Sequence, residues 1–96
     1  MVYNIQMNLT EKITIPSTVF AQIVDDEMVI LDTNSENYFA LDPIGTDMWQ
    51  TLVNDNSVEN LKKSMYEKYD VEEDVLEHDI EIFISKLLKN KLITLG

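Results

Sequence analysis

The sequence predicts an α+β domain in which three short antiparallel strands precede three helices. Two observations predict this class. Short apolar runs separated by polar turns occupy the first half of the chain, and helix caps followed by apolar residues at helical spacing occupy the second half. The length of 96 residues suits one domain with one hydrophobic core.

The three strands are expected at residues 18–24 (TVFAQIV), 28–32 (MVILD) and 38–41 (YFAL). The acidic residues 25–27 and the turn-forming residues 33–37 separate these runs, a pattern typical of an antiparallel meander. Because the runs show no clear alternation of apolar and polar residues, we expect the strands to be buried on more than one side.

The first two helices have recognisable starts. Asp42 can accept a capping hydrogen bond, and Pro43 stands at the one helical position where a missing N–H costs nothing. The polar residues 54–56 are expected to end this helix, and Ser57 to cap the second. Trp49 falls among apolar positions of the first helix, which favours a place in the core.

The third helix is expected to run from about Val71 to about Leu88. Asp70 would cap it, with Glu73 three residues later as in a capping box, and Asn90 fits its end. The apolar tail at residues 92–95 is expected to pack as an extended end or a small strand.

The chain is expected to divide into an N-terminal segment, residues 1–17, and a domain at residues 18–96. The weak alternation in the N-terminal segment allows a short extra edge strand there. The start of the chain lacks the basic and apolar regions of a signal peptide, and no apolar run is long enough to span a membrane. We therefore expect a cytoplasmic protein.

The charge balance restricts the partners. Eighteen Asp and Glu face seven Lys and no Arg, which gives a net charge of −11. Such a chain repels phosphate backbones and anionic lipids, so nucleic-acid and membrane partners are not expected. A basic or neutral protein or peptide is allowed, although solubility alone also accounts for the acidity.

Few residues could support catalysis or bind a metal ion. The chain has no Cys, one His (His78) and only two Gly, which excludes thiolate metal sites, a thiol nucleophile and a glycine-rich phosphate loop. The acidic residues 72–74 complement the dipole at a helix start, and the capping role of Ser57 explains the motif Asp55-Asn56-Ser57 better than a carrier-protein attachment site does. We expect no enzymatic activity, no metal and no cofactor.

The third helix carries more apolar surface than its core contact needs. Its main stripe contains Leu76, Ile80, Phe83, Ile84 and Leu87, with Lys91 at the end. Val75 and Ile82 fall on one flank, and Asp79 and Lys86 lie between this flank and the stripe. The flank either belongs to a wider core covered by another segment or forms one wall of a groove.

The third strand, residues 38–41, is an edge strand in a three-stranded meander. It contains none of the charges or prolines that usually protect an edge from pairing. Such an edge suits the addition of an extended peptide as a further strand. Alternatively, the N-terminal segment or a second copy of the chain covers it.

Two stretches carry a family resemblance. Residues 29–49 (VILDTNSENYFALDPIGTDMW) and 69–93 (YDVEEDVLEHDIEIFISKLLKNKLI) resemble, in the order and spacing of their motifs, the PqqD-like domains known as RiPP recognition elements. The similarity covers residues 18–95 approximately. It implies a winged-helix-like fold and binding of the leader region of a ribosomally synthesised precursor peptide.

The resemblance also implies a binding site and partners. The leader would add to the third strand and lie against the third helix, with a site formed by Tyr38, Phe39, Ala40, Leu41, Val75, Asp79, Ile82 and Lys86. A free-standing protein of this length is similar to the B1 proteins of lasso-peptide biosynthesis, which pass the precursor to a leader peptidase. The alternatives are a PqqD-type peptide chaperone for a radical SAM enzyme, a winged-helix DNA-binding protein, which the acidity disfavours, and a self-associating module such as a homodimer.

Overall fold

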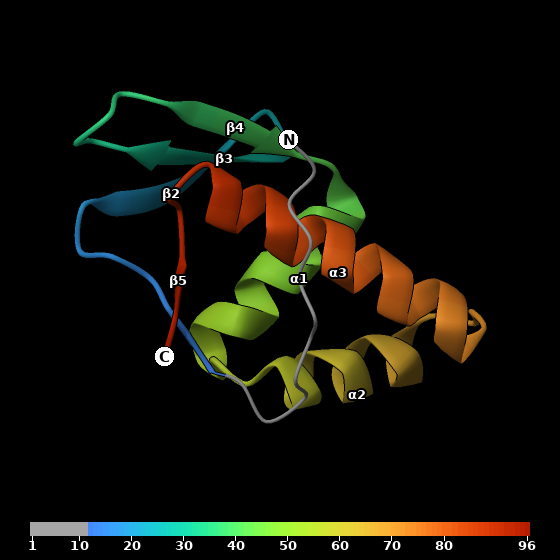
Figure 1. The fold of residues 1–96 in the computed structure, drawn as a ribbon. Coiled ribbons are helices and arrows are strands. Elements are labelled where there is room, and N and C mark those ends of the chain that lie inside the picture. The colour runs from blue at the N-terminus through green and yellow to red at the C-terminus, as the bar shows by residue number, and fades with distance from the viewer. Residues whose placement is uncertain (1–11) are drawn as a thin grey trace.

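The structure, a computed structural model, describes residues 12–96 and places three helices against one face of a sheet (Figure 1). The elements in chain order are β1 (Ile13–Thr14), β2 (Val19–Val24), β3 (Glu27–Asp32), β4 (Tyr38–Leu41), α1 (Pro43–Asn54), α2 (Val58–Lys68), α3 (Glu73–Lys89) and β5 (Thr94–Leu95). The main sheet is antiparallel, in the order β2-β3-β4. The predicted α+β class, with three strands followed by three helices, is confirmed.

A second, two-stranded sheet joins the two ends of the described chain. β1 pairs with β5, so the expected small strand in the tail is present. The side chain of Ile13 is fully buried, and its N–H donates to the Asn56 carbonyl at 2.9 Å. The expectation of an extra edge strand, where it concerns residues 1–11, falls outside the described residues.

The hairpin between β2 and β3 has a two-residue turn. Asp25 and Asp26 both adopt positive φ angles, of 52° and 66°. Positive φ at both turn residues is the geometry that matches the twist of a two-residue hairpin, and Asp tolerates it better than most residues do. This turn fixes the register in which Val24 pairs with Glu27.

A buried carboxylate holds the turn between β3 and β4. Asp32 accepts hydrogen bonds from the Ser35 hydroxyl at 2.7 Å and from the Asn34 N–H at 3.1 Å. The Ser35 hydrogen bond is the main reason that the pKa of Asp32 lies below its usual value. These hydrogen bonds fix the turn that places β4 beside β3.

The first two helices start as predicted. The Asp42 carboxylate accepts from the Gly45 N–H at 2.6 Å, and the Ser57 hydroxyl accepts from the Asn60 N–H at 3.3 Å. A Cβ at position 45 would lie 3.2 Å from Asp42 Oδ1 and 3.5 Å from Leu41 Cβ. Gly45 therefore allows the start of α1 to pack closely against the end of β4.

The third helix starts later than predicted. Its first residue is Glu73, and Glu72 precedes it without a side-chain capping hydrogen bond, so the prediction of Asp70 as the cap is wrong. The preceding segment stays extended because Tyr69 and Val71 both pack against the core. The end of the helix at Asn90 is confirmed.

Asp47 of α1 forms an ion pair and a hydrogen bond with residues at the end of α2. Asp47 accepts from Lys68 Nζ at 2.7 Å and from the Tyr69 hydroxyl at 2.8 Å. The Lys68 hydrogen bond is the largest cause that lowers the pKa of the Asp47 carboxyl. The hydrogen bond from the Tyr69 hydroxyl to Asp47 is the largest cause that raises the pKa of Tyr69. Together these contacts set the position from which the chain enters α3.

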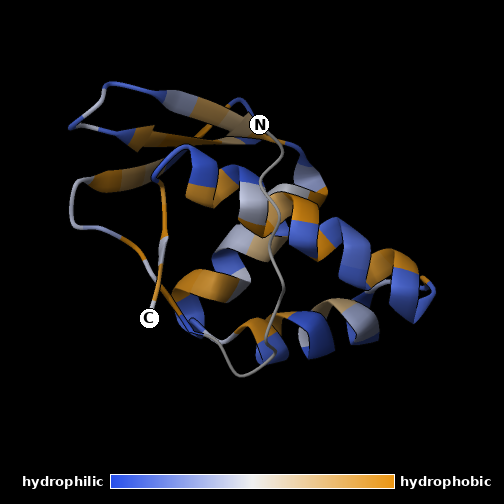
Figure 2. Ribbon diagram, in the orientation of Figure 1, coloured by the Kyte–Doolittle hydropathy of each residue, from blue (hydrophilic) through white to orange (hydrophobic). Residues whose placement is uncertain are grey.

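The hydrophobic core lies between the helices and one face of the sheet. It includes Trp49, as predicted, and fully buried side chains from every layer, among them Ile30, Leu52, Leu61, Ile80 and Ile84. The expectation that the strands are buried on more than one side is wrong. Only Val19 of β2 is buried, and burial alternates along β3, where Ile30 is buried but Leu31 is exposed. Figure 2 shows β2 and β3 as almost continuously hydrophobic, yet no helix covers the outer face of the sheet (Figure 1).

Candidate functional site: a groove beside an open sheet edge

Among residues 12–96, β4 pairs with β3 on one side only, as predicted for an edge strand. The hydrogen bond from the Asp32 N–H to the Asn37 carbonyl (2.9 Å) shows which residues pair directly. Antiparallel strands alternate between bonded and non-bonded pairs, so the main chains of Phe39 and Leu41 face β3. The N–H and C=O groups of Tyr38 and Ala40 consequently point outward, along the open edge.

A groove of about 240 Å³ lies between this edge strand and the C-terminal half of α3. Its lining comes from β4, the start of α1, the end of α3 and the segment that follows: Phe39, Ala40, Leu41, Asp42, Gly45, Phe83, Lys86, Leu87 and Leu92. A strand added to β4 would send every second side chain toward this groove, because side chains alternate between the two faces of a sheet.

The groove combines an apolar lining with one cation. Lys86 Nζ lies 5.9 Å from the centroid of the Phe39 ring, within the range of a cation–π interaction. Asp42 is the only acidic residue of the lining, and its carboxylate is occupied by the cap of α1. The groove can therefore take apolar side chains and offers Lys86 to a neighbouring polar or acidic group.

The structure brings some of the predicted site residues together. Phe39, Ala40, Leu41 and Lys86 all line the groove. Tyr38 begins the same edge but points its side chain to the outer face, where it is 71% exposed.

The other predicted residues lie on α3, outside the lining. Val75 and Ile82 are 46% and 53% exposed, and Asp79 is exposed as well. At spacings of four, three and four residues they share one face of α3 with Lys86, toward the start of the helix. They would extend the wall of the groove rather than line it.

Sequence reasoning missed several lining residues. Helical spacing places Phe83 and Leu87 in the core stripe of α3. Phe83 lies at the edge of this stripe nearest the exposed flank, a position that is consistent with its half-burial. Leu92 follows α3 after the left-handed residue Lys91, whose φ is 59°. Helical periodicity gives no information on where such a residue points.

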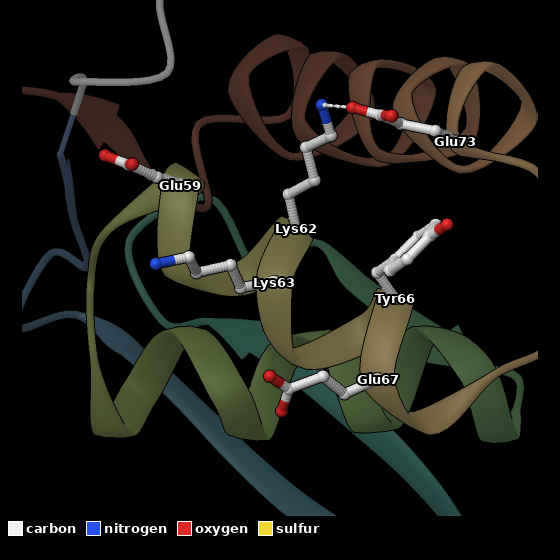
Figure 3. A pocket seen from close by; sticks show the side chains of 6 residues that line it. All are labelled: Glu59, Lys62, Lys63, Tyr66, Glu67 and Glu73. Carbon is white, nitrogen blue, oxygen red and sulfur yellow. Dashed lines mark hydrogen bonds and ion pairs between the residues drawn. The ribbon is translucent and has the colours of Figure 1, made fainter.

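A second hollow lies between α2 and α3 and contains none of the predicted residues. It measures about 330 Å³ and is lined by Glu59, Lys62, Lys63, Tyr66, Glu67 and Glu73 (Figure 3). Lys62 Nζ forms ion pairs with Glu73 at 2.9 Å and Glu77 at 3.3 Å, which tie the start of α3 to α2. These contacts position α3, the helix that forms the wall of the groove.

Neither a metal centre nor a membrane helix is found in residues 12–96. No three His, Asp or Glu side chains of this region are placed to share a metal ion. None of the helices described is long and apolar enough to cross a bilayer.

The comparisons with known proteins identify a family and a shared fold. Residues 27–93 match the family described as coenzyme PQQ synthesis protein D (PqqD). No curated protein matches the sequence.

Two solved structures share the fold. The complex of TbiB1 with the TbiA(beta) leader peptide has a TM-score of 0.77 and 28% identity, over 82% of this chain and 92% of that one. A lasso peptide synthetase B1 complexed with the leader peptide has a TM-score of 0.78 and 23% identity, over 86% of this chain and 98% of that one. Since the family match spans residues 27–93 and includes both β4 and α3, the chain belongs to the PqqD family.

Proposed function

We infer that this protein binds the leader region of a ribosomally synthesised precursor peptide and presents it to a maturation enzyme. The observation that carries this inference is the juxtaposition of an open edge, with outward-facing N–H and C=O groups at Tyr38 and Ala40, and an apolar groove beneath it. Backbone groups of the edge would supply affinity for any extended peptide, and the groove would select its side chains.

The similarity to TbiB1 supports a leader as the peptide. That protein, at 28% identity over 82% of this chain, is seen in complex with a leader peptide. The proposed role is binding without catalysis, and the partner enzyme in this proposal is a leader peptidase of lasso-peptide biosynthesis. A chaperone role for a radical SAM enzyme is the alternative within the same family.

The proposed site is longer than the groove. The twelve residues from Val75 to Lys86 span roughly 16 Å along α3 at a rise of 1.5 Å per step. About five residues of an extended leader would cover this length at roughly 3.3 Å each. A leader that fills the groove near Lys86 would therefore reach Ile82, Asp79 and Val75 with its next residues.

An amide NMR titration of the ¹⁵N-labelled protein with the leader peptide encoded beside its gene tests the proposal. We expect shifts concentrated at Tyr38–Leu41 and along α3 from Val75 to Leu87. Leu61 and Met65, buried in α2 away from the groove, serve as internal controls that should move little. If millimolar peptide produces no shifts, or shifts confined to α2, the protein does not recognise this leader at the groove.

A further inference from the structure

The outer face of the main sheet carries an apolar surface that no helix or strand of residues 12–96 covers, and we call it the outer-face patch. Phe20, Leu31 and Tyr38 lie directly opposite one another and form a row across all three strands. Val29 forms the next row with Gln22 and Ala40, and Val24 follows. The patch consists of Phe20, Val24, Val29, Leu31 and Tyr38, which line a shallow hollow of about 300 Å³.

This surface is unusual for a face in contact with water. Phe20 is 59% exposed and Tyr38 71% exposed, and both stand in one row with Leu31. Antiparallel sheets with one solvated face normally alternate apolar and polar residues, whereas β2 and β3 place apolar residues on both faces (Figure 2). Contiguous exposed apolar residues rimmed by charge are typical of protein interaction sites.

The charges around the patch favour a partner other than a second copy. Asp25, Asp26 and Glu27 stand at one end of the sheet and Glu36 at the other, and all four are exposed. The sequence contains no Lys or Arg from residue 13 to residue 61. Lys91 lines a hollow together with Asn34 and Ser35 of the β3–β4 turn, but the strands and turns of the main sheet carry no base of their own. Two copies meeting through this face would therefore bring the acids of the β2–β3 turn together, whereas a partner with an apolar centre and a basic rim would be attracted.

The patch is continuous with the proposed leader site. Tyr38 belongs both to the patch and to the open edge of β4. A leader added to β4 would widen the outer face by one strand, because alternate leader side chains would point to that side. Stable interfaces cover roughly 800 Å² on each partner, which is more than five side chains provide, so the neighbouring leader strand supplies the natural extension.

We propose that the outer-face patch is the docking surface for the maturation enzyme, which contacts the patch and the bound leader together through an apolar centre flanked by Lys or Arg. This inference rests on the proposed function, because it assigns a surface to the enzyme that receives the leader. The leader would extend the sheet beside β4, and the enzyme would cover the outer face of both, so that binding of the leader strengthens binding of the enzyme.

The experiment uses the full-length protein, the leader peptide and the maturation enzyme encoded beside its gene, with both affinities measured by titration calorimetry. Phe20→Ser and Val24→Lys should each weaken enzyme binding at least tenfold and change leader affinity less than twofold. Val53→Lys is the matched control, since Val53 is 57% exposed on α1, away from the sheet. Leader bound to the wild type should raise enzyme affinity. The affinity for the enzyme should also fall as salt increases, because salt screens the attraction between the acidic rim and a basic partner.

Several outcomes would overturn the proposal. Enzyme binding that is unchanged by Phe20→Ser, or lost equally with Val53→Lys, would place the enzyme elsewhere. A wild-type dimer that Phe20→Ser dissociates would assign the patch to a second copy, and NOEs from residues 1–11 to the Phe20 ring would assign it to the chain's own N-terminal segment. Leader binding without any enzyme binding would refute the docking surface alone, whereas failure to bind the leader would refute the proposed function.

Discussion

Replacement of Ala40 by Pro tests whether the leader adds as a strand to β4. Ala40 faces Val29 in a non-bonded pair, so its N–H points to the open edge and takes no part in the ladder with β3. Proline removes this donor and leaves the ladder intact, as it does on natural edge strands. The loss of one intermolecular hydrogen bond, worth about 1 kcal/mol net, corresponds to an increase in Kd of roughly fivefold.

The control is the same substitution on the opposite edge of the sheet. Ala21 is exposed on β2 and, by the same alternation, directs its N–H away from β3. Ala21→Pro should therefore leave the Kd for the leader unchanged in a fluorescence anisotropy titration, with folding of both variants checked by circular dichroism. A folded Ala40→Pro protein that binds like the wild type would refute strand addition at β4. If that variant does not fold, hydrogen exchange of the Ala40 amide in the wild type is measured instead. Strand addition at β4 requires that leader binding slows this exchange, and an unchanged rate would refute it.

Three further predictions address the wall of the groove and the frame that holds it. Ile82→Lys should weaken leader binding severalfold and change the free energy of unfolding by less than about 0.5 kcal/mol, as expected for an exposed side chain; if thermal melts show loss of the fold, Ile82 belongs to the core. Asp26→Gly should raise the free energy of unfolding by about 0.5–1 kcal/mol in urea titrations, because glycine adopts the φ of 66° without steric cost; a lower midpoint would contradict this account of the turn. Asp47→Asn should lower the free energy of unfolding at neutral pH. This deficit against the wild type should begin to shrink as the pH falls below the usual Asp value of 3.8, because the folded-state pKa of Asp47 is lowered and its contribution is lost as the carboxyl becomes protonated. A deficit that does not shrink at all between neutral pH and the acid limit of the fold would show that the charge of Asp47 is not its cause.

Most of the fold could be predicted because its signals are local. The strands and the first two helices are delimited by turn formers and caps that lie next to them in sequence, such as Asp42 and Ser57. The prediction of where α3 starts failed because a contact distant in sequence competes with the local cap. The Tyr69 hydroxyl donates to Asp47, twenty-two residues away, and this contact overrides the capping potential of Asp70. The prediction that the strands are buried on more than one side failed for a similar reason, since only the positions of the helices decide which sheet face is covered.

The candidate site was predictable only where it follows periodicity. The edge of β4 and the apolar flank of α3 both come from regular spacing. That spacing left open whether Val75 and Ile82 belong to a wider core or to the wall of a groove, and the structure finds both exposed. The floor of the groove depends on where the chain turns after α3, through Lys91 in a left-handed conformation, to place Leu92 beside Phe83. No pattern within a single helix contains this information.

The acidity and the unprotected edge of β4 explain each other. An uncharged edge strand normally risks pairing with another copy, and proteins usually prevent this with a charge or proline on the strand itself. Here Tyr38–Leu41 stays free of both, which a leader-binding edge requires, because a lysine there would also obstruct the peptide. We expect the net charge of −11 to provide the protection instead, because two copies approaching edge to edge would repel over roughly 8 Å at physiological ionic strength, whereas a neutral or basic leader would not be repelled. Repulsion spread over the whole molecule would thus leave the edge itself available to the peptide.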